Sequence, residues 1–192
     1  MILGITASQM RTAAPTPAGL TWDPDNTDPV GIILSDGNRV ATSASTGASH
    51  RLSRATVLHN AGDWYVEIVP TTAVSATEVS AGFAAASMPL TFSSIAPPGD
   101  YCFFRSNGQV FTSGGVYGGA FGAYIQNDVL GFAYKADSGE VRIYKNGALL
   151  KTLTLTPGLD FAPCAVLTST PDRSLEIRAT PLYLPAGYTY WG

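Results

Sequence analysis

Acidic residues are the first candidates for chemistry in this sequence. A retaining glycosidase needs two carboxylates about 5 Å apart, one as nucleophile and one as acid. An E-x-D-x-E strand supplies such a pair, because alternate residues of a strand share a face. None of the four glutamates here has an acidic residue two positions away: Glu67, Glu78, Glu140 and Glu176. The sequence therefore predicts no single-strand glycosidase pair, and an enzyme with carboxylates from distant strands is left as a minor alternative.

The two histidines, His50 and His59, are the available general bases. No G-x-S-x-G motif supplies a serine nucleophile for them. His50 lies in Ser/Gly-rich sequence and is expected to be a solvated loop residue, and His59 precedes a predicted turn at residues 60–62. At a spacing of nine they form no recognisable metal motif. We therefore expect no catalytic residue, no metal site and no cofactor.

Three aspartates near the N-terminus, Asp23, Asp25 and Asp28, are spaced almost like a calcium loop. The D-x-D-x-D-G pattern fails at Thr27 and lacks its glycine. Calcium binding is therefore the weaker interpretation of this segment.

Surface recognition is the remaining function, and aromatic side chains are the residues that suit it. Aromatic faces stack on sugar rings or pack into a protein partner, and arginine adds a planar donor group. Tyr117, which lies among glycines, is expected to be exposed, whereas Phe121 and Tyr124 could equally pack into the core below their loop. The predicted ligand-binding residues are Tyr101, Arg105, Tyr117, Phe121 and Tyr124.

Composition limits the classes of partner. The 192 residues include 11 Lys and Arg against 14 Asp and Glu, a net charge of −3, so nucleic acid is not an expected partner. No apolar run approaches the roughly 18 residues that span a membrane. Cys102 and Cys164 are expected to be buried apolar residues, with a disulfide as the less favoured alternative.

The elements that must position these residues are short strands. Turn dipeptides at close intervals, such as Asn107-Gly108 and Asn146-Gly147, are typical of an all-β sandwich. An Ala-rich stretch at residues 81–87 is predicted as strand rather than helical turn. The strongest predicted strands are residues 63–69, 129–135, 140–145, 148–155, 161–168 and 174–180; weaker ones are 30–34, 52–59, 79–85, 101–105 and 109–112. Four basic residues in the 135–151 region, Lys135, Arg142, Lys145 and Lys151, are interpreted as edge protection.

The two ends of the chain differ from this pattern. Residues 1–29 are predicted as an extended arm, because the prolines between residues 15 and 29 block helices and central strands. Its apolar tip, Met1, Ile2, Leu3 and Ile5, is the predicted attachment point for a partner. The aromatic C-terminus, residues 188–191, is expected to fold back onto the sandwich, with docking on a neighbouring subunit as the alternative.

Four landmarks in order resemble SPRY domains. They are Gly62-Asp63-Trp64-Tyr65-Val66-Glu67-Ile68, the run at residues 127–147 that ends in Tyr144-Lys145-Asn146-Gly147, Phe161-Ala162-Pro163-Cys164-Ala165-Val166, and Pro181-Leu182-Tyr183-Leu184-Pro185-Ala186-Gly187-Tyr188. The resemblance covers about residues 30–192. It implies a concanavalin-like jelly roll, a sandwich of two antiparallel sheets.

The first nine residues, Met1 to Gln9, are similar to the start of many small phage virion proteins. Our leading interpretation is therefore a non-enzymatic virion protein of a tailed phage, made in the host cytoplasm. It would bind a host-surface glycan or a neighbouring structural subunit. The alternative is a free-standing SPRY-type adaptor that recognises a peptide, and self-association is left open.

Overall fold

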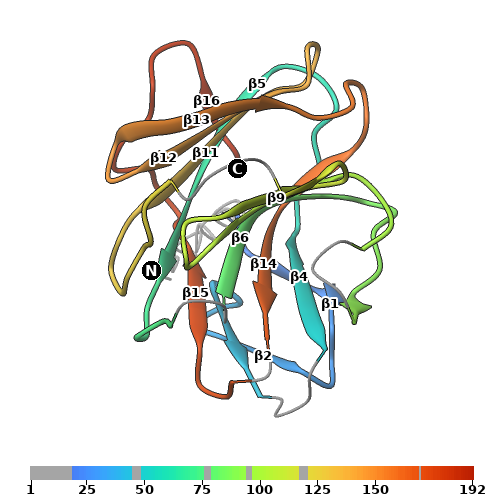
Figure 1. Cartoon of the computed structure of the whole chain (residues 1–192), viewed down its shortest axis with the longest axis vertical. Helices are drawn as coiled ribbons and strands as arrows, with labels where there is room; N and C mark the ends of the chain where they lie inside the picture. Colours follow the sequence, from blue (N-terminus) through green and yellow to red (C-terminus); the bar gives the residue numbers. More distant parts are fainter. Residues whose placement is uncertain (1–18, 45–48, 76–78, 94–96, 117–120, 169) are drawn as a thin grey trace, which may run out of the picture.

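The computed structural model describes residues 19–44, 49–75, 79–93, 97–116, 121–168 and 170–192. These residues form sixteen strands and no helix, and the strands make two layers (Figure 1). The described part of the chain therefore contains no helix that could cross a membrane.

Sheet A forms one layer. Its strands, in spatial order, are β1 (Trp22–Thr27), β4 (His50–Ala55), β14 (Phe161–Leu167), β6 (Val79–Ala85), β8 (Tyr101–Arg105), β9 (Val110–Thr112) and β10 (Gly115–Val116), with β7 (Thr91–Phe92) paired to β4. All of these pairs are antiparallel.

Sheet B forms the other layer. Its order is β13 (Ala148–Thr154), β12 (Glu140–Lys145), β11 (Leu130–Lys135), β5 (Asp63–Pro70), β15 (Ser174–Ile177), β3 (Val40–Ser43) and β2 (Ile32–Ser35). The short β16 (Thr189–Tyr190) runs parallel to the start of β5, where β15 does not reach. The predicted antiparallel two-sheet sandwich is confirmed, with this one parallel pair as a local exception.

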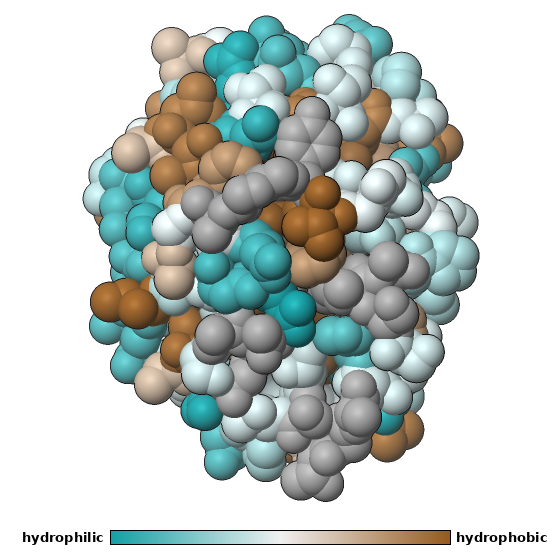
Figure 2. Space-filling view, in the orientation of Figure 1, coloured by the Kyte–Doolittle hydropathy of each residue, from teal (hydrophilic) through white to brown (hydrophobic). Residues whose placement is uncertain are grey.

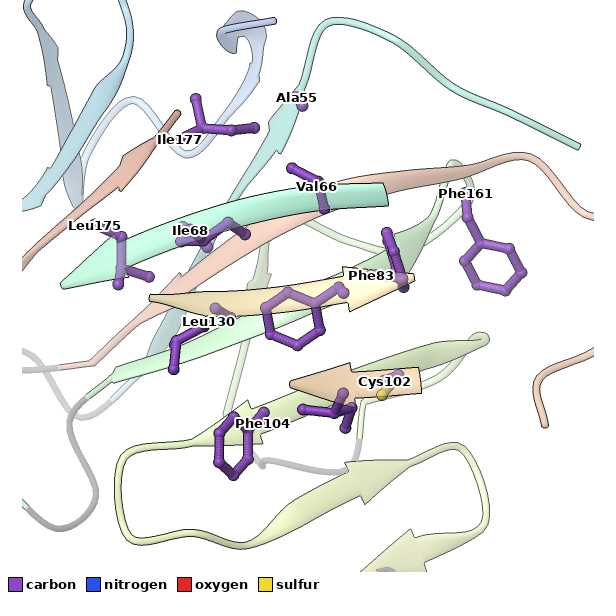
Figure 3. Packing of buried hydrophobic residues seen from close by; sticks show 14 of the residues in the cluster. Ala55, Val66, Ile68, Phe83, Cys102, Phe104, Leu130, Phe161, Leu175 and Ile177 are labelled. Atoms are coloured by element: carbon purple, nitrogen blue, oxygen red, sulfur yellow. The ribbon is translucent and has the colours of Figure 1, made fainter. Parts of the chain in front are cut away.

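Strand alternation builds the core between the layers. In β12, Val141 and Ile143 are fully buried, whereas Arg142 between them is partly exposed. Side chains of both sheets meet in this core, among them Phe83 of sheet A and Leu130 of sheet B (Figure 3). Phe83 also packs edge-on against Phe132 of sheet B. Asn146 and Gly147 adopt positive φ in the β12–β13 turn, as an Asn-Gly hairpin requires.

Most predicted strands are confirmed within a few residues, and β6, β8 and β12 match their predicted bounds. Residues 81–85 are strand, not helix. Both cysteines are buried and unpaired. Cys102 lies in the core between the sheets and Cys164 in an apolar cluster on the opposite side of sheet A, so they face away from each other.

The predicted arm of residues 1–29 needs correction at its C-terminal end. Residues 22–27 form β1 of sheet A despite Pro24, which an edge strand tolerates. Trp22 is fully buried, and its indole N–H donates to the Leu175 carbonyl across the sandwich. The attachment residues Met1, Ile2, Leu3 and Ile5 lie outside the described residues.

The C-terminal aromatics fold back, as expected. Trp191 is fully buried between the sheets, where its indole N–H donates to Val57 O at 2.9 Å and its ring stacks on Phe83. Tyr188 and Tyr190 pack against Tyr65 and its neighbours on the outer face of sheet B. Both ends of the described chain thus contribute a tryptophan to one core.

Candidate functional site

Two of the predicted ligand-binding aromatics, Tyr101 and Tyr124, are core residues. Tyr101 is fully buried and stacks on Phe103, so its ring lacks the exposure to solvent that its expected role in binding requires. Tyr124 is 1% exposed, with its hydroxyl within 2.8 Å of Val79 O and 3.2 Å of Phe104 O. Burial raises the pKa of both hydroxyls. Neither ring can stack on a sugar from solvent.

Tyr101 is buried because something covers its face of the sheet. Tyr101, Phe103 and Arg105 alternate onto the outer face of sheet A. Met88, in the loop after β6, and Phe92 of β7 pack on that face and enclose the rings of Tyr101 and Phe103. Strand periodicity puts these residues on one face, but it cannot show whether that face is covered.

Phe121, in contrast, docks on the turn after β8, whereas the Arg105 side chain lies over Phe111 on the outer face of sheet A. Phe121 N donates to Gly108 O at 2.8 Å, so the segment after β10 docks on this turn. Only glycine fits at position 108, because a Cβ there would lie 2.8 Å from the Gly122 backbone, and φ is +86°. Burial lowers the pKa of Arg105, which still carries its charge at ordinary pH, and its guanidinium lies 5.6 Å from the Phe111 ring centre.

Two lysines of sheet B complete this surface. The Lys151 ammonium lies 5.3 Å from the Phe121 ring centre, within cation–π range. Lys145 Nζ donates to Ala123 O at 2.9 Å. Ile125 is 65% exposed beside them. We call Phe121, Ile125, Lys145 and Lys151 the rim.

The rim combines cations with exposed apolar surface. Asp128 is the acidic neighbour, and its two carboxylate oxygens accept from Ile125 N and the Asn146 amide. Lys145 and Lys151 therefore lie close to an engaged carboxylate, in a chain whose net charge is −3. Such a surface suits an apolar segment that carries acidic residues.

Sequence reasoning identified only part of the rim. It singled out Phe121, but it interpreted Lys145 and Lys151 only as edge protection and did not consider Ile125. Arg105, which it also singled out, lies on the outer face of sheet A. The contact of Lys151 with Phe121 joins residues 30 positions apart and has no local signal. Tyr117 lies outside the described residues.

The histidines have structural partners. The sequence predicted His50 as a solvated loop residue, and this prediction is wrong. His50 begins β4, is 9% exposed and stacks on Phe92, with 5.3 Å between the ring centres. Burial, with a smaller effect from Arg105, lowers its pKa to about 4. His59 stacks on Trp64 at 3.5 Å. No group of three or more metal-ligating side chains occurs among the described residues.

The carboxylates are similarly engaged. Asp28 is 3% exposed and accepts from Val30 N, Gly31 N and the Arg51 guanidinium. Asp23, another of the possible calcium ligands, accepts from Asp25 N and the Asn26 amide. These contacts give Asp23 a structural role within β1 and Asp28 one in the turn that follows it.

The chain resembles known proteins in its fold rather than in its sequence. No protein-family model matches the sequence, and no curated protein matches it. Solved structures do match: the SPRY domain of human HERC1 superposes with a TM-score of 0.69 at 15% identity, over 81% of this chain and 96% of that one. The chain has the fold of a SPRY domain.

Two further structures share the SPRY fold with this chain. The TRIM65 PSpry domain superposes with a TM-score of 0.60 at 17% identity, over 83% of this chain and 92% of that one. Stonustoxin superposes with a TM-score of 0.64 at 18% identity, and the match covers 83% of this chain but 27% of the toxin chain. At these identities the likeness concerns the fold. The SPRY-like landmark at residues 127–147 forms the β11–β12 hairpin of this fold.

Proposed function

We propose that this chain is a non-enzymatic binding protein whose rim holds an acidic, partly apolar segment of another protein. The observation that carries the proposal is the contact of Lys151 with the Phe121 ring, beside Lys145 and the exposed Ile125. An SPRY-fold sandwich provides the rigid support that a binding loop needs. A protein partner is favoured over a glycan, because Tyr101 and Tyr124 are buried.

The partner we propose is a neighbouring structural subunit of a tailed-phage particle. The support is the similarity of residues 1–9 to the opening of small virion proteins. Under this proposal, the chain is made in the host cytoplasm and resides in the virion.

The binding proposal is tested by screening the full chain against a random peptide library and a glycan array. Peptides rich in acidic and apolar residues are expected to bind. The double variant Phe121→Ala, Lys151→Ala should weaken them at least tenfold, about 1.4 kcal/mol. The matched control is Ile33→Ala, which removes an exposed side chain on β2 at the other edge of sheet B. Glycan binding without peptide binding, or peptide binding indifferent to the rim variant, would overturn the proposal.

The virion proposal needs a separate experiment on particles. Mass spectrometry of purified phage from the source of the sequence should detect the chain in stoichiometric amounts. Cross-linking should then join Lys145 or Lys151 to another structural subunit. Absence of the chain from particles would refute this part and leave the binding proposal to its own test.

A further inference from the structure

Among the described residues, four strands end the two sheets, besides the two-residue β7 and β16, and three of these four are blunted. β1 carries Pro24 between two aspartates and has a register shift against β4. β10 has two residues, and β2 has four and ends in a turn with positive φ at residues 36–38. Prolines, charges, bulges and short length are the usual means by which proteins prevent edge-to-edge pairing.

β13 is longer than these three strands and less protected, although it too has a register shift, against β12 between Ile143 and Tyr144. It extends over seven residues, contains no proline and carries one charge, Lys151. Among the described residues it pairs with β12 alone, so one row of its backbone N–H and C=O groups faces away from the sheet. Lysine is a common guard of such an edge, but the Lys151 ammonium lies over Phe121 at the rim.

An exposed apolar surface borders this edge. Leu149 pairs with Tyr144, a member of the outer cluster of sheet B, and therefore lies on the outer face. Tyr183 lies against Gly147, where a Cβ would be 2.9 Å from its ring. The exposed fractions are 53% for Leu149, 57% for Leu182, 40% for Tyr183 and 45% for Leu184. We call these four residues the β13 patch; Figure 2 shows hydrophobic residues gathered at the upper left, in the region of β13 and the C-terminal segment in Figure 1.

The β13 patch is held in this exposed position by a buried carboxylate. Glu67 is fully buried and accepts from Leu182 N at 2.7 Å and from Tyr183 N at 2.6 Å. Because the backbone of this segment is bound to the sheet, its apolar side chains remain at the surface. Exposed apolar groups in a fixed arrangement beside a free strand edge are typical of an interaction surface.

We infer that β13 pairs with β13 of a second copy of this chain, in an antiparallel contact that joins the two B sheets. A two-fold contact requires a surface that complements itself, and an uncharged apolar patch does so. The neighbouring charges are already paired: Arg178 with Glu67 at 3.2 Å and Arg142 with Glu140 at 2.9 Å. The four residues of the β13 patch are therefore uncharged and these charged neighbours are paired. Lys151, the one charge of β13 itself, lies on the other face of the strand, with its ammonium over Phe121.

The first test is the mass of the full chain in solution, by light scattering and sedimentation velocity at up to about 100 µM, because a small interface gives micromolar affinity. A dimer is expected. Leu149→Lys should raise its dissociation constant at least tenfold, whereas Ile33→Lys, on the other edge of sheet B, should leave it unchanged. A chain that is monomeric throughout this concentration range overturns the inference. It does so even if a different protein is then found to cover the β13 patch.

A second measurement locates the interface without relying on a destabilising variant. Nitroxide labels at Thr152→Cys should lie within roughly 30 Å of each other, because seven residues span about 23 Å whatever the register. Labels at Ile33→Cys should be roughly 50–60 Å apart, since six strand spacings of about 4.8 Å separate β13 from β2 in each copy. The native cysteines are buried and should not react. A dimer with distant Thr152 labels refutes the β13 contact, and Phe121→Ala should leave the dimer intact whether or not the rim binds a partner.

Discussion

Replacement of Glu67 by glutamine should destabilise the protein by about 2–4 kcal/mol. Four donors converge on the buried carboxylate. Oε1 accepts from Tyr183 N and the Tyr65 hydroxyl, and Oε2 accepts from Leu182 N and lies 3.2 Å from the Arg178 guanidinium. Burial, and secondarily the Glu67 charge, raises the pKa of Tyr65, so its hydroxyl keeps its proton.

The magnitude follows from what the amide cannot do. In the glutamine variant, an NH₂ group replaces one of the two carboxylate oxygens. This NH₂ group is a donor and faces two other donors, one of which is a backbone N–H, so that N–H loses its acceptor. An unsatisfied buried N–H costs about 1–3 kcal/mol. Arg178 is 34% exposed and can recover water, so loss of the ion pair adds no more than about 1 kcal/mol.

Urea denaturation at pH 7 measures this difference through the change in midpoint at constant slope. Glu140→Gln is the matched control: its carboxylate lies 2.9 Å from Arg142 at a surface where both side chains are about a third exposed, and it should cost less than about 1 kcal/mol. Hydrogen exchange should accelerate at the Leu182 and Tyr183 amides of the Glu67 variant. A Glu67→Gln protein within about 0.5 kcal/mol of wild type would refute the reasoning.

Three further substitutions test other parts of the structure. The pKa of His50 is about 4 in the folded protein, against an ordinary value of 6.5. The stability that this shift provides is therefore present above pH 6.5, and roughly 2–3 kcal/mol of it is lost as the pH falls toward 4. His50→Phe should reduce this loss, measured by urea titrations at pH 7 and pH 4.5. Trp191→Ala should cost about 3–5 kcal/mol in the same assay, because it empties a fully buried site. Gly82→Ala should prevent native folding, measured by near-ultraviolet circular dichroism, because its Cβ would lie 1.9 Å from Cys102 O.

Each of these has a distinguishing outcome. Equal acid sensitivity of wild type and His50→Phe would show that His50 is not the titrating group. A Trp191→Ala protein as stable as wild type would mean that the C-terminal segment is not part of the core. A native-like spectrum for Gly82→Ala would show that β6 and β8 approach each other less closely than described. Ala84→Gly, at a buried position in the same strand, is the control that should still fold.

Much of the fold could be predicted because its strands carry local signals. β5 and β12 alternate apolar and polar residues, and Asn146-Gly147 specifies a hairpin turn. The strands that were missed lack such signals: β3 is a four-residue strand of small and polar side chains, and β1 contains a proline. β16 has two residues and exists through its pairing with β5, which no local pattern records.

The candidate site was harder to predict than the fold, for a physical reason. Alternation indicates which residues share a face, but the cover of that face comes from elsewhere in the chain. Tyr101 is enclosed by Met88 and Phe92, and Lys151 reaches Phe121 from the other sheet. The aromatic residue type that suggested binding in Tyr101 is also the type that dominates buried cores.

The covered faces restrict where this sandwich can bind anything. Met88 and Phe92 pack on the outer face of sheet A, and the C-terminal segment packs on the outer face of sheet B. The broad faces, which could otherwise offer the largest contact areas, are therefore already occupied by the chain itself over much of their described extent. A partner must approach the ends or edges of the layers, and there the described residues expose the cationic rim and the long, weakly guarded β13. These two surfaces are adjacent, because Lys151 extends from the strand to the rim, so a dimer formed through β13 would place two rims near its junction.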